Sequence, residues 1–123
     1  MTQKTNKQIL GNKGEKVAIN YLTKKGYTVQ HTNYRIGRAE IDIIVTKNSD
    51  TVFVEVKTRS TIKFGYPEDF VSFKQQKTLI DAAEKFVNEC VEITSIRFDV
   101  ISVIIENNIV RVRHFEDAFW PLL

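Results

Sequence analysis

Two neighbouring segments of alternating residues, joined by a short polar turn, constrain this chain more than any other feature. Residues 40–45 read E-I-D-I-I-V, and residues 51–57 read T-V-F-V-E-V-K. Side chains alternate across a strand, so each segment predicts a strand with two distinct faces. The polar residues between them, 47–50, favour a tight connection. The sequence therefore predicts an antiparallel hairpin.

This hairpin carries charged side chains in segments that are otherwise apolar. Strict alternation puts Asp42 and Glu40 on one face of the first strand, and Glu55 and Lys57 on one face of the second. If the register allows, two carboxylates and one ammonium converge on one patch of sheet. An E-x-K triplet alone is common on solvated strands. A carboxylate beside a run as apolar as residues 43–45, however, is costly to bury unless it is paired or bound to a metal.

Carboxylates in such an arrangement predict a cation. Two carboxylates a few ångströms apart repel each other unless a positive charge lies between them. Hard oxygen ligands of this kind suit Mg²⁺ or Mn²⁺. We therefore expect Asp42 and Glu55 to bind Mg²⁺ or Mn²⁺.

A series of short motifs extends the pattern along most of the chain, from about Gly11 to Phe119. The motifs are Gly14-Glu15, Lys25-Gly26-Tyr27, Asn33-Tyr34-Arg35, Glu40-Ile41-Asp42-Ile43-Ile44, Val54-Glu55-Val56-Lys57-Thr58-Arg59, Gly65-Tyr66-Pro67 and Arg97-Phe98-Asp99-Val100-Ile101. The series is similar to the uncharacterised bacterial YraN-like family, whose fold resembles that of archaeal Holliday-junction resolvases. Asp42 followed by Glu55-Val56-Lys57 resembles the core of the PD-(D/E)xK nucleases, with Ile41 where that motif has a proline.

The resemblance implies a metal-dependent nuclease that cleaves DNA rather than RNA, including branched DNA. The implied catalytic residues are Glu15, Asp42, Glu55 and Lys57, and the carbonyl of Val56 would join the metal ligands. Lys57 would orient the attacking water or neutralise developing charge. Resolvase-like relatives make paired cuts, so the resemblance also implies a homodimer. A module of a different class remains as the alternative: a nucleic-acid-binding or protein-interaction module on the same fold that cuts nothing.

Three further side chains have both a functional and a structural interpretation. Glu15 borders the apolar stripe of its predicted helix and so could face the sheet and the site. Gly11 and Gly14 would permit the helix to approach the sheet closely there. Alternatively, Glu15 is a first-turn glutamate that the helix dipole favours. Glu40 could assist with metal or water, or form a rim ion pair with an arginine, Arg38 or Arg59. Gln76 could reach the site, or it could be a buried amide whose hydrogen bonds are made within the protein.

Basic residues are the candidates for binding nucleic acid. The net charge of +3 is compatible with a nucleic-acid partner without requiring one. Arg59 and Lys63, in the long segment after the second strand of the hairpin, and Lys74, just beyond it, are expected to hold phosphates. No sequence-reading element is visible, so we expect recognition of shape rather than base sequence.

The remaining periodicity predicts one domain, residues 1–123, with the order α-β-β-β-α-β-β. The expected helices cover residues 4–25 and about 72–90, and the expected strands cover 28–34, 40–46, 51–58, 96–105 and 109–115. Residues 43–45 and 100–104 look buried on both sides, which places helices on both faces of a mixed sheet. The fold class expected is a restriction-endonuclease-like three-layer α/β/α fold with a central five-stranded sheet.

Composition excludes several classes. The single cysteine, Cys90, rules out an internal disulfide and any multi-cysteine zinc site. The sequence has no N-terminal apolar run, so we expect no signal peptide, no membrane span and a cytoplasmic location. Arg97 and Asp99 share a strand face and are expected to pair with each other. His114, with the aromatic residues that follow it, is expected in a C-terminal apolar clasp.

Overall fold

The helices and strands follow one another in the predicted order. The computed structural model describes residues 3–61, 71–90 and 92–120, and within these it contains two helices and five strands. They are α1 (Asn6–Lys24), β1 (Thr28–Ile36), β2 (Ala39–Lys47), β3 (Asp50–Arg59), α2 (Phe73–Glu89), β4 (Ser95–Glu106) and β5 (Ile109–Phe115).

Both helices begin at a polar cap. The hydroxyl of Thr5 accepts a hydrogen bond from the Gln8 N–H, and the Gln8 side chain accepts one from the Thr5 N–H, so α1 begins slightly later than predicted. Ser72 caps α2 by accepting a hydrogen bond from the Gln75 N–H, at the residue where this helix was expected to begin. Gly26 follows the end of α1 with a φ of +92°, a conformation that glycine adopts without strain.

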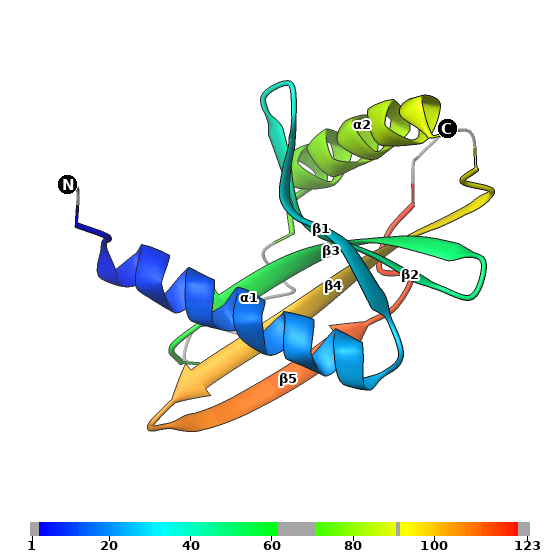
Figure 1. Cartoon of the computed structure of the whole chain (residues 1–123). Coiled ribbons are helices and arrows are strands. Elements are labelled where there is room, and N and C mark those ends of the chain that lie inside the picture. Colours follow the sequence, from blue (N-terminus) through cyan, green and yellow to red (C-terminus); the bar gives the residue numbers. More distant parts are fainter. Residues whose placement is uncertain (1–2, 62–70, 91, 121–123) are drawn as a thin grey trace.

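The five strands form one mixed sheet in the order β1-β2-β3-β4-β5. Within it, β3 and β4 pair in parallel from Asp50↔Ser95 to Arg59↔Ile104, and the other neighbours pair antiparallel. The connection between the two parallel strands contains α2, as a parallel crossover requires. Figure 1 shows α1 in front of the sheet and α2 above it.

Each helix covers its own apolar layer, which confirms that the sheet is buried on both faces. The layer under α1 contains Ala18, Leu22, Tyr27, Ile43, Val45, Val52, Val54, Ile101 and Val103. The layer under α2 contains Ile41, Ile44, Phe53, Leu79, Ala82, Ala83, Phe86 and Phe98. No helix in the described residues is long and apolar enough to cross a membrane.

The alternation predicted for β2 breaks at Asp42, and this part of the prediction was wrong. Ile43 packs under α1, but Ile41, expected on the same face, packs under α2. Pairing of β2 with β3 stops at Ile43↔Val54. In β1, Asn33 has a φ of +50°, which asparagine tolerates better than most residues. The hairpin of β1 and β2 therefore bends away from the sheet and rises beside α2 (Figure 1).

A buried ionic network lies under α1, away from the bend. Arg97 donates hydrogen bonds of 2.8 Å to both oxygens of Asp99, as predicted, and the Asp117 N–H donates a third. The ring of His114 lies 2.6 Å from the same carboxylate. Burial alone would raise the pKa of Asp99, but the hydrogen bonds from His114 and Arg97 outweigh it and lower the pKa. Both oxygens of the buried Asp99 carboxylate have partners, so we assign this network a structural role.

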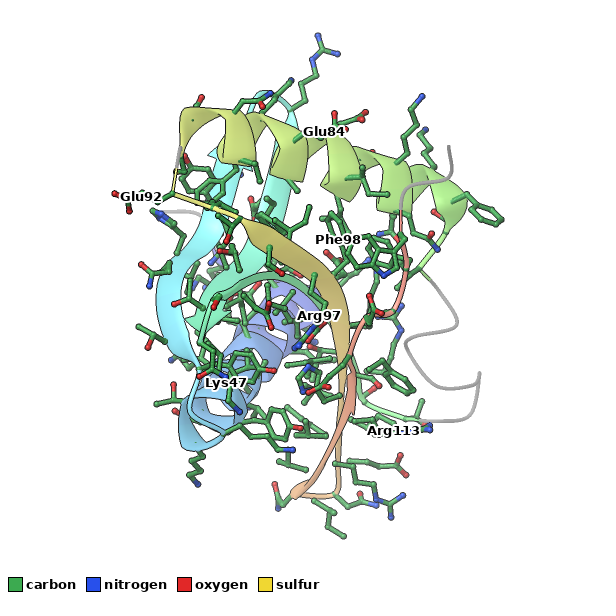
Figure 2. All side chains as sticks on the ribbon, turned by 90° about the vertical axis from the view of Figure 1, so that its right-hand side faces the viewer. Lys47, Glu84, Glu92, Arg97, Phe98 and Arg113 are labelled. Carbon is green, nitrogen blue, oxygen red and sulfur yellow. The ribbon has the colours of Figure 1, made fainter. Side chains whose placement is uncertain are left out.

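The C-terminal segment packs on the other layer. Phe119 stacks on Phe98 with ring centroids 5.2 Å apart, and Trp120 meets the same ring edge-on at 6.3 Å. Figure 2 shows Phe98 among the rings beneath α2 and Arg97 on the opposite side of β4. The predicted apolar clasp therefore forms around Phe98, but His114 does not belong to it because Asp99 holds its ring.

Candidate active site

A cavity of about 910 Å³ opens between the N-terminal half of α1 and the end of β3. Its lining contains the four residues predicted to be catalytic, together with Val56; they are Glu15, Asp42, Glu55 and Lys57. Alternation puts Glu55 and Lys57 on one face of β3, and Asp42 reaches them because β2 leaves β3 at the break described above. The structure thus brings the predicted carboxylates and ammonium together.

Asp42 takes the place of a strand partner at the fork between β2 and β3. Its Oδ2 accepts a hydrogen bond of 2.8 Å from the Val56 N–H, just beyond the last paired residues. The N–H and C=O of one strand residue point the same way, so the Val56 carbonyl also faces the fork. A carboxylate and a carbonyl are therefore directed into the same gap.

The acidic side chains at the fork carry unfavourable charge. Burial and the neighbouring Glu55 raise the pKa of Asp42 to about 8, against the lowering effect of the Val56 hydrogen bond. Burial also raises the pKa of Glu55, although Lys57 opposes the shift. The Lys57 ammonium lies 3.6 Å from Glu55 Oε1, and each of these two side chains is only 13% exposed. One lysine does not offset both carboxylates, so the fork favours a further cation.

Glu15 points toward the fork from α1. Asn33 donates a 3.3 Å hydrogen bond to its carboxylate, and the charge of Glu15 raises the pKa of Asp42 and Glu55. Burial raises the pKa of Glu15 itself, with Asn33 opposing the shift. The first turn of α1 holds no acidic residue, so the alternative of a first-turn glutamate was wrong. Glu15 lies more than two turns into the helix.

Gly14 lets α1 approach β3 beside these residues. A Cβ on Gly14 would overlap Thr58 Oγ1 and lie 2.7 Å from Thr58 Cβ, which no rotation of the threonine can move away. No described atom lies within 4 Å of a Cβ built on Gly11. The predicted close approach is therefore confirmed for Gly14 and wrong for Gly11.

We expect Gly14→Ala to lower the free energy of unfolding by about 1–3 kcal/mol, because the new methyl group overpacks the contact with Thr58. Gly11→Ala is the matched control on the same helix. It should raise the free energy of unfolding by up to about 1 kcal/mol, because alanine favours helix over glycine. Urea denaturation of both variants measures the two changes. Equal stabilisation by both substitutions would contradict the close contact between α1 and β3.

The other predicted residues lie at different distances from the fork. Arg59 lines the same cavity, whereas Glu40 and Lys74 line a smaller cavity that also contacts Glu55. Glu40 pairs at 3.3 Å with Arg35, its cross-strand neighbour, an arginine that was not considered from the sequence. Lys63 lies outside the described residues.

The structure does not bring Gln76 to the fork. Its amide donates a 3.2 Å hydrogen bond to the Val71 carbonyl, which agrees with the interpretation as a satisfied amide. Gln75, one residue earlier, lines the smaller cavity instead.

Sequence reasoning missed two residues that shape the site. Asn33 donates a hydrogen bond to Glu15, and Thr58 lies in close contact with Gly14. An asparagine within a strand is a signal for left-handed backbone, and it could have located the bend opposite Asp42. The chain offers no comparable signal for Thr58, because its partner is distant in sequence.

The site offers an ion two carboxylates rather than three. Among residues 3–61, 71–90 and 92–120, no three side chains of the types Asp, Glu, His and Cys are grouped closely enough to hold a metal together. Oxygen ligands from Asp42, Glu55 and the Val56 carbonyl are the set that the fork provides. Glu15 would then act through water.

Fold and site together define a mixed α/β protein with a recessed carboxylate–lysine cavity at the end of its central parallel strand pair. The chain belongs to the uncharacterised protein family UPF0102, whose model matches residues 14–103. It is 44% identical over 111 residues to a UPF0102 protein of Flavobacterium psychrophilum, covering 90% of this chain and 93% of that protein. A UPF0102 protein of Clostridioides difficile is 46% identical over 110 residues, with 89% and 95% covered.

Proposed function

We propose that this protein is a metal-dependent nuclease that cleaves phosphodiester bonds of DNA, including branched DNA. The observation that carries the proposal is the meeting of Asp42, Glu55 and Lys57 in one cavity, with Asp42 at the point where two strands part. This arrangement resembles the PD-(D/E)xK core to which the sequence points. A buried carboxylate pair of raised pKa is costly for a module that only binds.

The chemistry of the ligand set fits a small divalent ion. Asp42, Glu55 and the Val56 carbonyl present hard oxygen atoms, and Mg²⁺ commonly takes one or two carboxylates with water in its remaining positions. When bound, Mg²⁺ or Mn²⁺ would lower the pKa of a water molecule and offset the charge of a phosphate. The raised pKa of Asp42 is what burial without a sufficient positive charge produces.

The other side chains have roles that follow from their positions. Lys57 places an ammonium beside Glu55, where it would orient water or neutralise charge that develops on the phosphate. Asn33 fixes the orientation of Glu15, whose carboxylate would hold a water molecule and accept its proton. Arg59, on the wall of the cavity, would position the phosphate backbone without reading bases.

Incubation with single-stranded, duplex, flapped and four-way DNA, each with Mg²⁺, with Mn²⁺ and with chelator, tests this function. We expect cleavage of at least one substrate that requires the divalent ion. Absence of cleavage in all of these conditions, together with retained binding, would favour the module that binds without cutting.

A further inference from the structure

Glu55 lies between two cavities rather than at the end of one. The larger cavity, of about 910 Å³, reaches from Glu55 along the N-terminal half of α1. A second cavity, of about 240 Å³, lies between Glu55 and the start of α2 and is lined by Glu40, Ser72, Lys74, Gln75, Thr78 and Leu79. Glu55 lines both cavities, so a chain molecule that crosses Glu55 would pass from one cavity into the other.

Each cavity carries a lysine at its wall. Lys7 and Lys13, from exposed positions on α1, line the larger cavity, and Lys74 lines the smaller one. Ile9, Leu10 and Ile105 complete the larger cavity with apolar surface. Among the described residues, the positively charged side chains of both cavity walls are lysines and Arg59, which suit phosphate contacts.

The depth of the site separates flexible from stiff substrates. Only 13% of the Glu55 side chain and 13% of the Lys57 side chain are exposed, below walls formed by two helices. Duplex DNA is stiff, with a persistence length of about 50 nm, so bending its backbone into such a recess costs free energy that a single strand does not spend. A single strand can bend and bring one phosphate down to the carboxylates.

We infer that the strand recognised here is single-stranded, either free or as the flap of a branched molecule, and that it runs from the α1 cavity across Glu55 into the α2 cavity. This inference rests on the proposed nuclease function and names the substrate class of that site. Lys13 holds phosphates on one side of Glu55, and Lys74 holds them on the other. The cut falls between the two lysines.

Binding can be measured separately from cleavage. A labelled DNA strand of mixed sequence and the same strand in a duplex are titrated with the protein by fluorescence anisotropy, in Ca²⁺ and at several salt concentrations. We expect the single strand to bind at least about tenfold more tightly than the duplex. Lys13→Ala and Lys74→Ala should each weaken single-strand binding about threefold to tenfold and reduce its salt slope by about 0.7.

Matched controls lie further along the same helices. Lys24→Ala, in the last turn of α1, and Lys85→Ala, in the second half of α2, line neither cavity and should leave single-strand affinity unchanged. Equal affinity for strand and duplex, or weakening by only one of Lys13→Ala and Lys74→Ala, would overturn the path. The expected binding pattern without cleavage in Mn²⁺ would support the path and reject the nuclease. If duplex is cleaved as fast as single strand and both lysine variants are fully active, the nuclease is supported and the single-strand path is rejected.

Discussion

Lys57→Ala should still bind Mg²⁺ or Mn²⁺ but cleave DNA about 10²–10³-fold more slowly than the wild-type protein, because one electrostatic catalyst is removed. The ammonium lies 3.6 Å from Glu55 Oε1 in a site that is largely shielded from water. Its charge therefore acts more strongly on a phosphate than an exposed lysine would. Single-turnover cleavage of the best substrate in Mn²⁺ measures the loss.

The controls separate chemistry from folding and from general charge. Lys24→Ala removes the same charge from an exposed position in the last turn of α1 and should cleave at the wild-type rate. Lys57→Gln keeps most of the length of the side chain and, without its charge, should be nearly as slow as Lys57→Ala. Wild-type cleavage by both Lys57 variants would remove this residue from the mechanism.

Asp42→Asn should make the metal-free protein more stable, and the gain should grow with pH. The folded pKa of Asp42, about 8, lies above its ordinary value of 3.8. Between these pH values the unfolded chain releases a proton that the folded chain retains, so the free energy of unfolding falls as pH rises toward 8. Asparagine does not titrate, can still accept the Val56 hydrogen bond, and can donate one to Glu55. We expect a gain on the order of 3 kcal/mol above pH 8 and little gain near pH 4.

The same variant should respond weakly to metal. A divalent ion that binds only the folded protein adds about 2.7 kcal/mol at a hundredfold excess over its dissociation constant. Asp42→Asn removes one charged ligand and should lose most of this gain. Urea denaturation of both proteins at pH 5 and pH 8.5, with chelator, measures the first effect, and Mn²⁺ titration of thermal melts near pH 7.5 measures the second. A destabilised Asp42→Asn protein, with a wild-type protein that ignores Mn²⁺, would reject the metal site.

The sequence predicted the helices and strands because their signals are local. The period of two around Val54 and Glu55 and the polar turn before Thr51 each depend on a few neighbouring residues. The same alternation predicted that Glu55 and Lys57 share a face. These features needed no knowledge of distant contacts.

The parts that could not be predicted depend on residues far apart in the chain. The break in β2 requires Asp42 to replace a strand partner of Val56 and Asn33 to adopt left-handed backbone on the adjacent strand. Periodicity cannot show such a break, because Ile41 and Ile43 look alike in sequence although they pack in different layers. The partner of His114 was likewise hidden, since only the fold brings it to Asp99.

The parallel pairing of β3 with β4 also bears on the order in which the chain can fold. The other neighbouring strands of the described sheet are consecutive in sequence, whereas β3 and β4 are separated by α2 and its connections. Bringing distant segments together costs loop-closure entropy before their contacts form, so we expect local hairpins to form earlier than the β3–β4 pair. Asp42 and Glu55 belong to one such hairpin. We therefore expect these two carboxylates to meet while water still surrounds them, before the two helices wall off the site.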